Sequence, residues 1–445
     1  MTQSSKGLRA GVAVRDISPL KPLFLAGYPH VARISTGLHD PLLASALYLC
    51  DGATPLLLIG VDILFVSAQS TGLCRAAISG ATGIPPANIL ISATHSHSGP
   101  LTTAVLAWKE DSVVPPPDPD YMRQFHQGII EAGIASYAAA EPARLAVTTA
   151  AAEGVGGNRL DPAGPFDSQV GLLAVQRQSD GRWMALDLVY GMHPTVLHED
   201  SRVISSDFLH FTRRHIGEAF AGLVTVCHVG PCGNLSPRHH VKGQTMAEAE
   251  RLGRRLGEVV VRSLRSLTGA NFHDDVVLAA GQRKVELAAN QFPTVQEAET
   301  ALRQARHQYE ELTLKGAPSS AARTAECVVF GREESVTLAR AQASGEVAQW
   351  QERYRFAEAQ AFRIGDLFLA ALPGEFFVEY GLEIKSRAPG RAFVITLANG
   401  ELQGYIVTPE ASNGGGYEAL FALFRSESGA RMVQATLELL RELSL

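Results

Sequence analysis

Two histidines stand directly after an apolar segment in the sequence ILISATHSHSGP, residues 89–100. A turn at this point needs the glycine and the proline at its end, but it does not need two imidazoles. His95 and His97 are separated by one residue, so on a strand their side chains would share one face and could be directed at one metal ion. The residues alone leave a second interpretation open, in which one histidine makes a local hydrogen bond and the other faces solvent.

Polar residues follow four more apolar segments, a few positions beyond the end of each: His193 after 183–192, Ser236 after 222–230, Glu375 after 361–372 and Tyr405 after 391–399. In open α/β sheets, ligands bind in the crevice beyond the carboxyl ends of the strands. We therefore expect these residues to converge with the histidine pair on one site. Two imidazoles and a carboxylate are ligands that suit Zn²⁺ and leave a coordination position open.

Each of these residues, taken alone, also has a structural interpretation. His193 precedes a proline, which favours extended backbone, and a lone histidine there could be structural. Glu375 opens a predicted helix, where a carboxylate is favourable at the N-terminus. Tyr405 could be a buried aromatic residue with a hydrogen-bonded hydroxyl. Their shared position after strands is what favours a common site.

Apolar segments rich in β-branched residues alternate with segments of helical periodicity. The predicted strands are 55–66, 88–93, 183–192, 222–230 and 391–399, and the predicted helices are 67–81, 118–139, 206–219 and 245–267. Such alternation predicts an α/β fold, and strands that are apolar on both sides are covered on both faces. We expect one domain over residues 1–445, with α/β/α layers around a central mixed sheet.

Residues 293–361 differ from the rest of the chain, because they form two long, charged segments with helical spacing, separated near residues 316–318. This pattern predicts a helical hairpin inserted at one side of the sheet. Its charges favour a solvated face over a binding site. The segment 361–372 follows, and its Gly365-Asp366 pair between two apolar runs predicts a β-hairpin.

The composition excludes several classes of protein. The formal net charge is −6 and no run of lysine or arginine stands out, so no nucleic-acid partner is expected. No apolar run of about eighteen residues predicts a membrane span, and residues 1–12 lack the apolar core of a signal peptide. The odd number of cysteines argues against a disulfide framework and favours the cytoplasm: they are Cys50, Cys74, Cys227, Cys232 and Cys327.

The motifs THSHSGP, MHPT, GNLSP, LPGEF and GYIVTPE…YE occur in this order in the chain. They resemble the neutral/alkaline (non-lysosomal) ceramidase superfamily, whose corresponding stretches read roughly THTHSGP, VHxTS, GDVSP, PGEFT and THYxTTxEEY…YE. The resemblance extends from VRDISP (14–19) and GLHDPLLASALYL (37–49) to about Glu418. It corresponds to the N-terminal catalytic domain of that family, without the additional C-terminal β-sandwich of its classical members.

The resemblance implies one catalytic zinc ion per chain, held by His95, His193, Glu375 and Tyr405. His97 is then the residue that transfers a proton beside the ion. Arg159 matches a family arginine and could bind a substrate carbonyl or the developing oxyanion; the alternative is an ion pair with Asp161 or Asp167.

Two further residues are expected to contact substrate or to support a ligand. Ser236 matches the serine of GDVSP and is expected to bind substrate. It is not expected to be a nucleophile, because its motif offers no base to activate it. Asp207 matches a family aspartate and is expected beside the substrate site or behind a metal ligand.

Departures from the family pattern lie next to the expected ion and bear on the substrate. GNLSPR replaces GDVSPN and is followed by two histidines, and His198, Glu199 and Asp200 stand where the family has asparagine-rich sequence. These three residues could bind a second metal ion, and the sequence does not decide whether they do. The zinc chemistry is therefore expected to transfer better than the ceramide specificity.

The sequence thus predicts a zinc-dependent hydrolase in which metal-activated water cleaves a carbon–nitrogen amide bond. The expected substrate is a small soluble N-acyl compound or amide, with ceramide possible. A metal-dependent esterase or lactonase is one alternative, and a non-catalytic metal-dependent binding protein for small molecules is the other. We expect no stable membrane insertion. The sequence does not decide between a monomer and a homo-oligomer.

Overall fold

The computed structural model describes residues 7–317 and 319–445. The first residues of the segment 1–12 and Pro318, near the expected break in the helical hairpin, lie outside the described residues. An eight-stranded sheet forms the centre of the fold, and its strands in spatial order are β11 (Val224–Val229), β9 (Trp183–Tyr190), β8 (Gln169–Arg177), β6 (Glu141–Ala151), β1 (Arg9–Asp16), β3 (Leu43–Cys50), β4 (Pro55–Val61) and β5 (Ile89–Ala93). β4 and β5 are parallel, as are β9 and β11, whereas the other neighbours are antiparallel. The predicted mixed sheet is confirmed.

A second sheet packs on one face of the first. Its strands in order are β13 (Leu278–Glu286), β14 (Phe356–Ile364), β15 (Leu367–Ala371) and β17 (Arg391–Ile395). Apolar side chains from both sheets form one buried cluster, in which Leu58 and Leu173 of the first sheet join Phe362 and Phe393 of the second. The expected arrangement has one central sheet between two helical layers. The structure has two stacked sheets between the helices, because β14, β15 and β17 belong to the second sheet and not to the central one.

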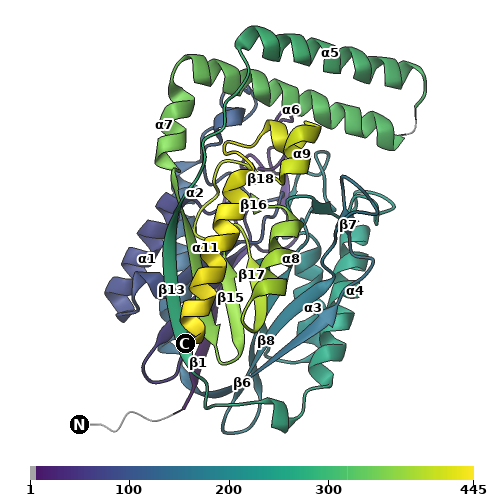
Figure 1. Cartoon of the computed structure of the whole chain (residues 1–445). Coiled ribbons are helices and arrows are strands. Elements are labelled where there is room, and N and C mark those ends of the chain that lie inside the picture. Colours follow the sequence, from purple (N-terminus) through teal and green to yellow (C-terminus); the bar gives the residue numbers. More distant parts are fainter. Residues whose placement is uncertain (1–6, 318) are drawn as a thin grey trace.

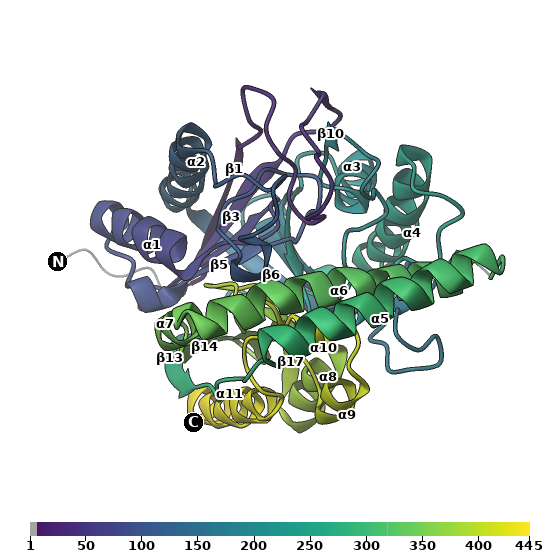
Figure 2. The same ribbon diagram turned by 90° about the horizontal axis from the view of Figure 1, so that it is seen from above.

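Helices cover the outer faces of the two sheets. One group packs on the eight-stranded sheet: α1 (Ala68–Thr82), α2 (Pro119–Ala138), α3 (Phe208–Ala219) and α4 (Met246–Arg265). α8 (Val378–Arg387) and α11 (Glu427–Ser444) pack on the four-stranded sheet (Figure 2). The first four match the predicted helices closely because their signals are local. For example, the side chain of Ser67 accepts from the backbone N–H of Ser70 at the start of α1, and Gly83 ends that helix with a φ of 76°.

The predicted helical hairpin consists of α5 (Val295–Leu314) and α6 (Ser319–Ala343), followed by α7 (Glu346–Arg353). It lies across the end of the sheets, with α6 between α5 and the rest of the fold (Figure 1). A reciprocal capping box between Thr294 and Glu297 starts α5. The predicted end at residue 361 is wrong, because the chain leaves the helices after Arg353 and enters strand β14.

Several connections between the main strands and helices contain short elements of their own. β14 and β15 form the predicted hairpin, with Ile364 opposite Leu367 and Gly365 at a φ of 60°. Three two-stranded pairs follow: β2 (Gly37–Leu38) with β10 (Val203–Ile204), β7 (Gly157–Asn158) with β12 (Leu235–Ser236), and β16 (Glu375–Phe376) with β18 (Tyr405–Ile406). The remaining helical turns are η1 (Pro86–Asn88), η2 (Leu106–Trp108), η3 (Gly269–Asn271), α9 (Pro409–Gly414) and α10 (Tyr417–Leu420).

All five cysteines are free thiols, and Cys227 and Cys232 are buried. No helix among the described residues combines the length and the apolarity needed to cross a membrane.

Candidate active site

Three of the predicted metal ligands meet beyond the ends of strands from both sheets. His95 follows β5, His193 follows β9, and Glu375 begins β16 shortly after β15. The Nε2 atoms of His95 and His193 lie 3.2 and 3.3 Å from the same atom, Oε2 of Glu375. All three residues are buried. Residues separated by up to 280 positions in the chain (from 95 to 375) are thus brought within bonding distance of one point.

The outer nitrogens of the two histidines are fixed by the backbone. Nδ1 of His95 donates to the carbonyl of Leu64 (3.0 Å), and Nδ1 of His193 donates to the carbonyl of Cys232 (2.7 Å). These bonds turn both Nε2 atoms inward, which is the usual support for a metal-binding imidazole. Within the described part of the chain, the two Nε2 atoms and Oε2 of Glu375 have no hydrogen-bond partner. Buried polar atoms are rarely left unpaired, so this set fits a bound cation.

Burial favours the neutral, metal-binding form of two of these imidazoles, His193 and His97. It lowers the pKa of His193 to about 4, and the charge of Arg159 acts in the same direction. Burial also lowers the pKa of His97 well below its ordinary value. Burial opposes ionisation of Glu375, but the neighbouring His95 and His193 outweigh it and hold the pKa of this carboxyl well below its usual range. Neutral imidazoles and a carboxylate are the protonation states that a zinc site requires.

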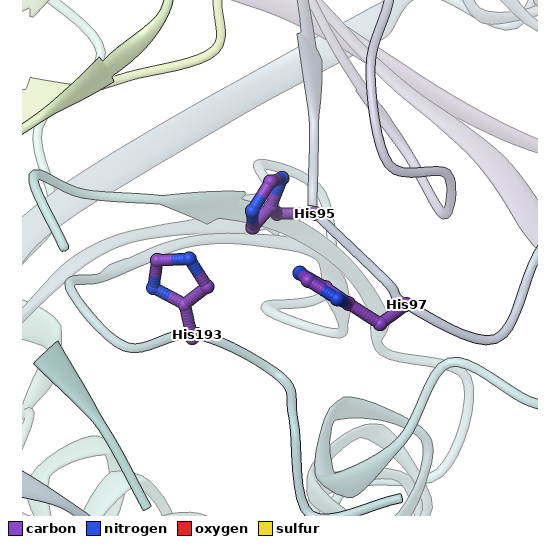
Figure 3. Close-up of side chains that lie close together, drawn as sticks. All are labelled: His95, His97 and His193. Carbon is purple, nitrogen blue, oxygen red and sulfur yellow. The ribbon is translucent and has the colours of Figure 1, made fainter. Parts of the chain in front are cut away.

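His97 lies with His95 and His193 in one cluster, whose ligand nitrogens are all within 4.8 Å of one another. The three rings face a common point (Figure 3), and neither nitrogen of His97 has a hydrogen-bond partner among the described residues. This position allows His97 to act as a third imidazole ligand as well as the predicted proton carrier.

The two histidines do not share the face of a strand, so that part of the prediction is wrong. β5 ends at Ala93, and His95 has a φ of 66°. A non-glycine residue in this left-handed region is uncommon and concentrates at functional sites. The rings of His95 and His97 stand nearly perpendicular at a centroid distance of 4.8 Å, because the loop and not strand alternation brings them together.

Gly27 is packed against the ring of His97. Its φ is 102°, and a Cβ at this position would lie 2.3 Å from Nδ1 of His97. We expect Gly27→Ala to displace the ring and to lower kcat/KM for hydrolysis about 100-fold, the typical effect of a misplacement near 1 Å. Gly72→Ala on α1 is the control, since nothing lies within 4 Å of a Cβ there. Steady-state kinetics on the two variants decide, and unchanged activity in Gly27→Ala would contradict the role of this packing.

Tyr405 and Arg159 complete the wall next to the ligand set. Tyr405 stands opposite Glu375 in the parallel β16–β18 pair. Nη2 of Arg159 donates to the hydroxyl of Tyr405 (3.2 Å) and to the carbonyl of Gly233 (2.8 Å), and its Nε donates to Oε1 of Glu418 (2.8 Å). Arg159 is thus held beside the predicted ligand with its charge directed toward the site.

The alternative pairing of Arg159 with Asp161 or Asp167 is wrong. Asp167 forms an ion pair with Lys385 at 2.6 Å, and the carboxylate of Asp161 accepts from the backbone N–H of Ala163. The partner of Arg159, Glu418, lies 259 residues away in the sequence, so no local signal could identify it.

Ser236 lies in β12 and lines the cavity beside the ligands. Its Oγ accepts from the backbone N–H of Arg238 (3.3 Å). This N–H is a donor and cannot act as a base that would make the hydroxyl nucleophilic. Its predicted role in substrate contact is compatible with this position.

Asp207 does not line the cavity. Its carboxylate accepts from the backbone N–H groups of Leu197 (2.8 Å) and Phe208 (2.6 Å), and burial raises its pKa to about 7. It therefore caps α3 and anchors the loop that follows His193. This is a supporting role behind a predicted ligand, and the geometry offers no substrate contact.

In the segment His198–Asp200, an arginine binds the carboxylate that could otherwise bind a second metal ion. Arg323 of α6 donates to both carboxylate oxygens of Glu199 (2.8 and 3.0 Å). Burial opposes ionisation of Glu199, but the hydrogen bond from His198 and the charge of Arg323 outweigh it and lower the pKa to about 2. Because a guanidinium already neutralises this carboxylate, the geometry disfavours a second metal ion here. In the described ranges, only one cluster of potential metal ligands (histidine, cysteine or carboxylate side chains) is close enough together to hold an ion, and it consists of His95, His97 and His193.

A cavity of about 590 Å³ opens above the ligand set, and α6 forms one of its walls. Its lining contains functional candidates that the sequence analysis missed: Tyr28, Trp108, Arg323, Glu334 and Glu418. The α6 residues that line it, among them Arg323, Cys327, Phe330 and Glu334, recur at helical spacing. The inner face of the hairpin therefore belongs to the site, in contrast to the solvated face that its charges suggested.

A Ser–His–Asp series also occurs, but away from the cavity. Oγ of Ser92 lies 2.6 Å from Nδ1 of His228, whose Nε2 lies 2.9 Å from Asp187. All three residues are at most 2 % exposed. They join β5, β11 and β9 inside the sheet, so they stabilise it and offer no accessible nucleophile.

The two stacked sheets, the helices on both outer faces and the site beyond the strand ends make a neutral-ceramidase-like fold. The chain superposes on the crystal structure of neutral ceramidase from Pseudomonas aeruginosa with a TM-score of 0.76 at 17% identity, covering 99% of this chain and 75% of that one. It superposes on a structure of ceramidase complexed with C2 with a TM-score of 0.75 at 17% identity, covering 99% and 76% of the two chains. Comparisons with protein-family models and with curated proteins give no match. The resemblance stated from the motifs is thus confirmed for the fold.

Proposed function

We propose that this protein is a zinc-dependent hydrolase that cleaves the carbon–nitrogen amide bond of an N-acyl compound. The observation that carries the proposal is the convergence of Nε2 of His95, Nε2 of His193 and Oε2 of Glu375, which are buried and make no hydrogen bond within the described residues. This set lies at a cavity whose volume suits a small organic ligand. The ceramidase-like fold supports an amide as the bond that is cleaved.

His95, His193, Glu375 and Tyr405 would hold the ion. Bound zinc supplies Lewis acidity, which polarises a carbonyl group and makes water nucleophilic at neutral pH. Arg159, fixed by Glu418 and the carbonyl of Gly233, places a permanent positive charge where the carbonyl oxygen becomes negative. An amine leaves only when it is protonated. His97, whose two ring nitrogens have no hydrogen-bond partner among the described residues, can take a proton from the attacking water and pass it to the leaving amine.

The cavity lining bears on the substrate. It combines aromatic rings with charged side chains, among them Arg238, Arg323 and Glu334. Most of the exposed lining is apolar and can take an acyl group, whereas the charged side chains in the wall can bind polar groups of the substrate. We therefore propose a small soluble N-acyl compound or amide as the substrate, with ceramide as the alternative.

The test compares an acyl p-nitroanilide with the p-nitrophenyl ester of the same acyl group on the zinc-loaded protein. We expect hydrolysis of the amide by the wild type, and a loss of 10²–10⁴-fold in His97→Ala that is far smaller for the ester, whose leaving group needs no proton. Zinc content of His97→Ala separates the two roles of this residue, since a ligand variant loses the ion and a proton-transfer variant keeps it.

His239→Ala is the matched control, because this histidine is exposed and lies outside the cavity lining. Hydrolysis of esters alone would replace the proposal by a metal-dependent esterase or lactonase. Zinc binding without hydrolysis of any amide or ester would replace it by a binding protein.

A further inference from the structure

One carboxyl group in the cavity wall has no task in the reaction proposed above. Glu334 lies on α6 and is 1 % exposed, yet it belongs to the cavity lining. Its Oε1 accepts from Nε1 of Trp108 (3.0 Å) and from the hydroxyl of Tyr417 (3.4 Å). Its Oε2 is buried and has no hydrogen-bond partner in the described ranges. One oxygen of this group is therefore held in place, and the other has an unused acceptor position within the described residues.

Glu334 also differs from the other acidic residues of the cavity in its charge balance. Those residues all have basic partners, namely Arg323 for Glu199 and Glu326, Arg159 for Glu418, and His95 and His193 for Glu375. No such partner faces Glu334 among residues 7–317 and 319–445.

Burial raises the pKa of Glu334 to about 8, and the charges of Glu333 and Asp111 add to this effect. Asp111 itself is bonded to His30 at 2.6 Å. Without a ligand the group is mostly protonated at neutral pH. A cation bound in the cavity would supply the missing countercharge and favour the ionised form.

Aromatic rings surround the same part of the cavity. Trp108 and Phe421 stack with a centroid distance of 6.4 Å, and Tyr417 lies 6.3 Å from Phe421. Phe330, one turn before Glu334 on α6, also lines the cavity. Aromatic faces attract cations, and together with a carboxylate they form a common type of ammonium site. The ring of Tyr417 is 6.1 Å from that of Tyr405, so this part of the cavity is one aromatic ring away from the predicted ligand set.

We propose that Glu334 binds an ammonium group that the substrate carries away from the scissile bond. The substrate class is then an N-acyl compound or amide with a free amino group. This inference rests on the proposed function in taking the cavity as the substrate site, but the binding of an ammonium group does not depend on turnover.

The test uses hexylamine, which is protonated at neutral pH, and hexanol as its neutral counterpart. Both are titrated into the zinc-loaded wild type and into Glu334→Gln by calorimetry. We expect the wild type to bind hexylammonium at least about tenfold more tightly than hexanol, the size of one hydrogen bond to a charged group. Glu334→Gln keeps the acceptor for Trp108 and Tyr417 but cannot ionise, so we expect it to lose this preference.

Glu299→Gln is the matched control. It makes the same chemical change in the same hairpin, at an exposed ion pair with Arg340, and should keep the preference. Equal affinity for the two ligands in the wild type, no binding of hexylammonium, or a preference that survives in Glu334→Gln would each overturn the inference. Ligation of zinc by the amine would survive in Glu334→Gln and is excluded by the same comparison. Failure of amide hydrolysis alone would refute the proposed function and leave this result intact.

Discussion

We expect His95→Ala to leave the protein folded but without bound zinc and without hydrolytic activity, and we expect the same of Glu375→Ala. Each change removes one of the few inward-facing donor atoms, which lie 3.2 Å apart in the wild type. Loss of an outer-shell contact to a ligand already lowers metal affinity 10–100-fold, so loss of a ligand lowers it more than about 100-fold. Elemental analysis after zinc loading and dialysis should give about one zinc per chain for the wild type and a negligible amount for both variants.

Thermal unfolding of the metal-free proteins provides the check on folding, and His239→Ala provides a histidine replacement outside the cavity. A wild type that takes up no zinc when it is supplied would refute the proposed mechanism. Full zinc retention in both variants would place the ion elsewhere.

Arg159→Ala is expected to have the second largest effect, on stability as well as on activity. Glu418 is 4 % exposed and has Arg159 as its ion-pair partner at 2.8 Å. Removing the arginine leaves a buried carboxylate uncompensated, which typically costs about 3–5 kcal/mol. It also removes the charge beside Tyr405, and loss of one oxyanion-stabilising group lowers kcat by about 10²–10³-fold.

The double variant Arg159→Ala with Glu418→Gln separates the two effects. Denaturant unfolding should show that the second change recovers much of the lost stability, because no charge remains buried. The activity should stay low, because the positive charge is still missing. Recovery of activity together with stability would show that Arg159 acts only as a structural partner of Glu418.

The sequence predicts the α/β class and the bounds of α1 to α4, because periodicity and helix caps are local. It misses β1, β3, β6 and β8, which make up half of the eight-stranded sheet. It does not predict which sheet a strand joins. The predicted helical hairpin includes the first residues of β14, 356–360, whose alanine, glutamate and glutamine favour helices, whereas the rest of β14 lies in the predicted β-hairpin. Pairing with β13 and β15 overrides that preference.

The candidate site is predictable to the extent that its residues follow strands. His95, His193, Glu375 and Tyr405 are found in this way and then brought together by the fold. Glu418 and Glu334 are not, because their partners are distant in the chain. Glu334 in particular lies in a charged helix, and only the packing of α6 against the cavity shows that this carboxyl is buried.

The predicted ligands are divided between the two sheets. His95 and His193 follow strands of the eight-stranded sheet, whereas Glu375 and Tyr405 follow strands of the four-stranded sheet. An ion bound by all four is therefore a crosslink between two layers that otherwise adhere through apolar contact. Binding that is confined to the folded state stabilises a protein by about 2.7 kcal/mol at a free ligand concentration of one hundred times Kd. Resistance to heat and to proteases would then rise and fall with the zinc supply around the protein, independently of any substrate.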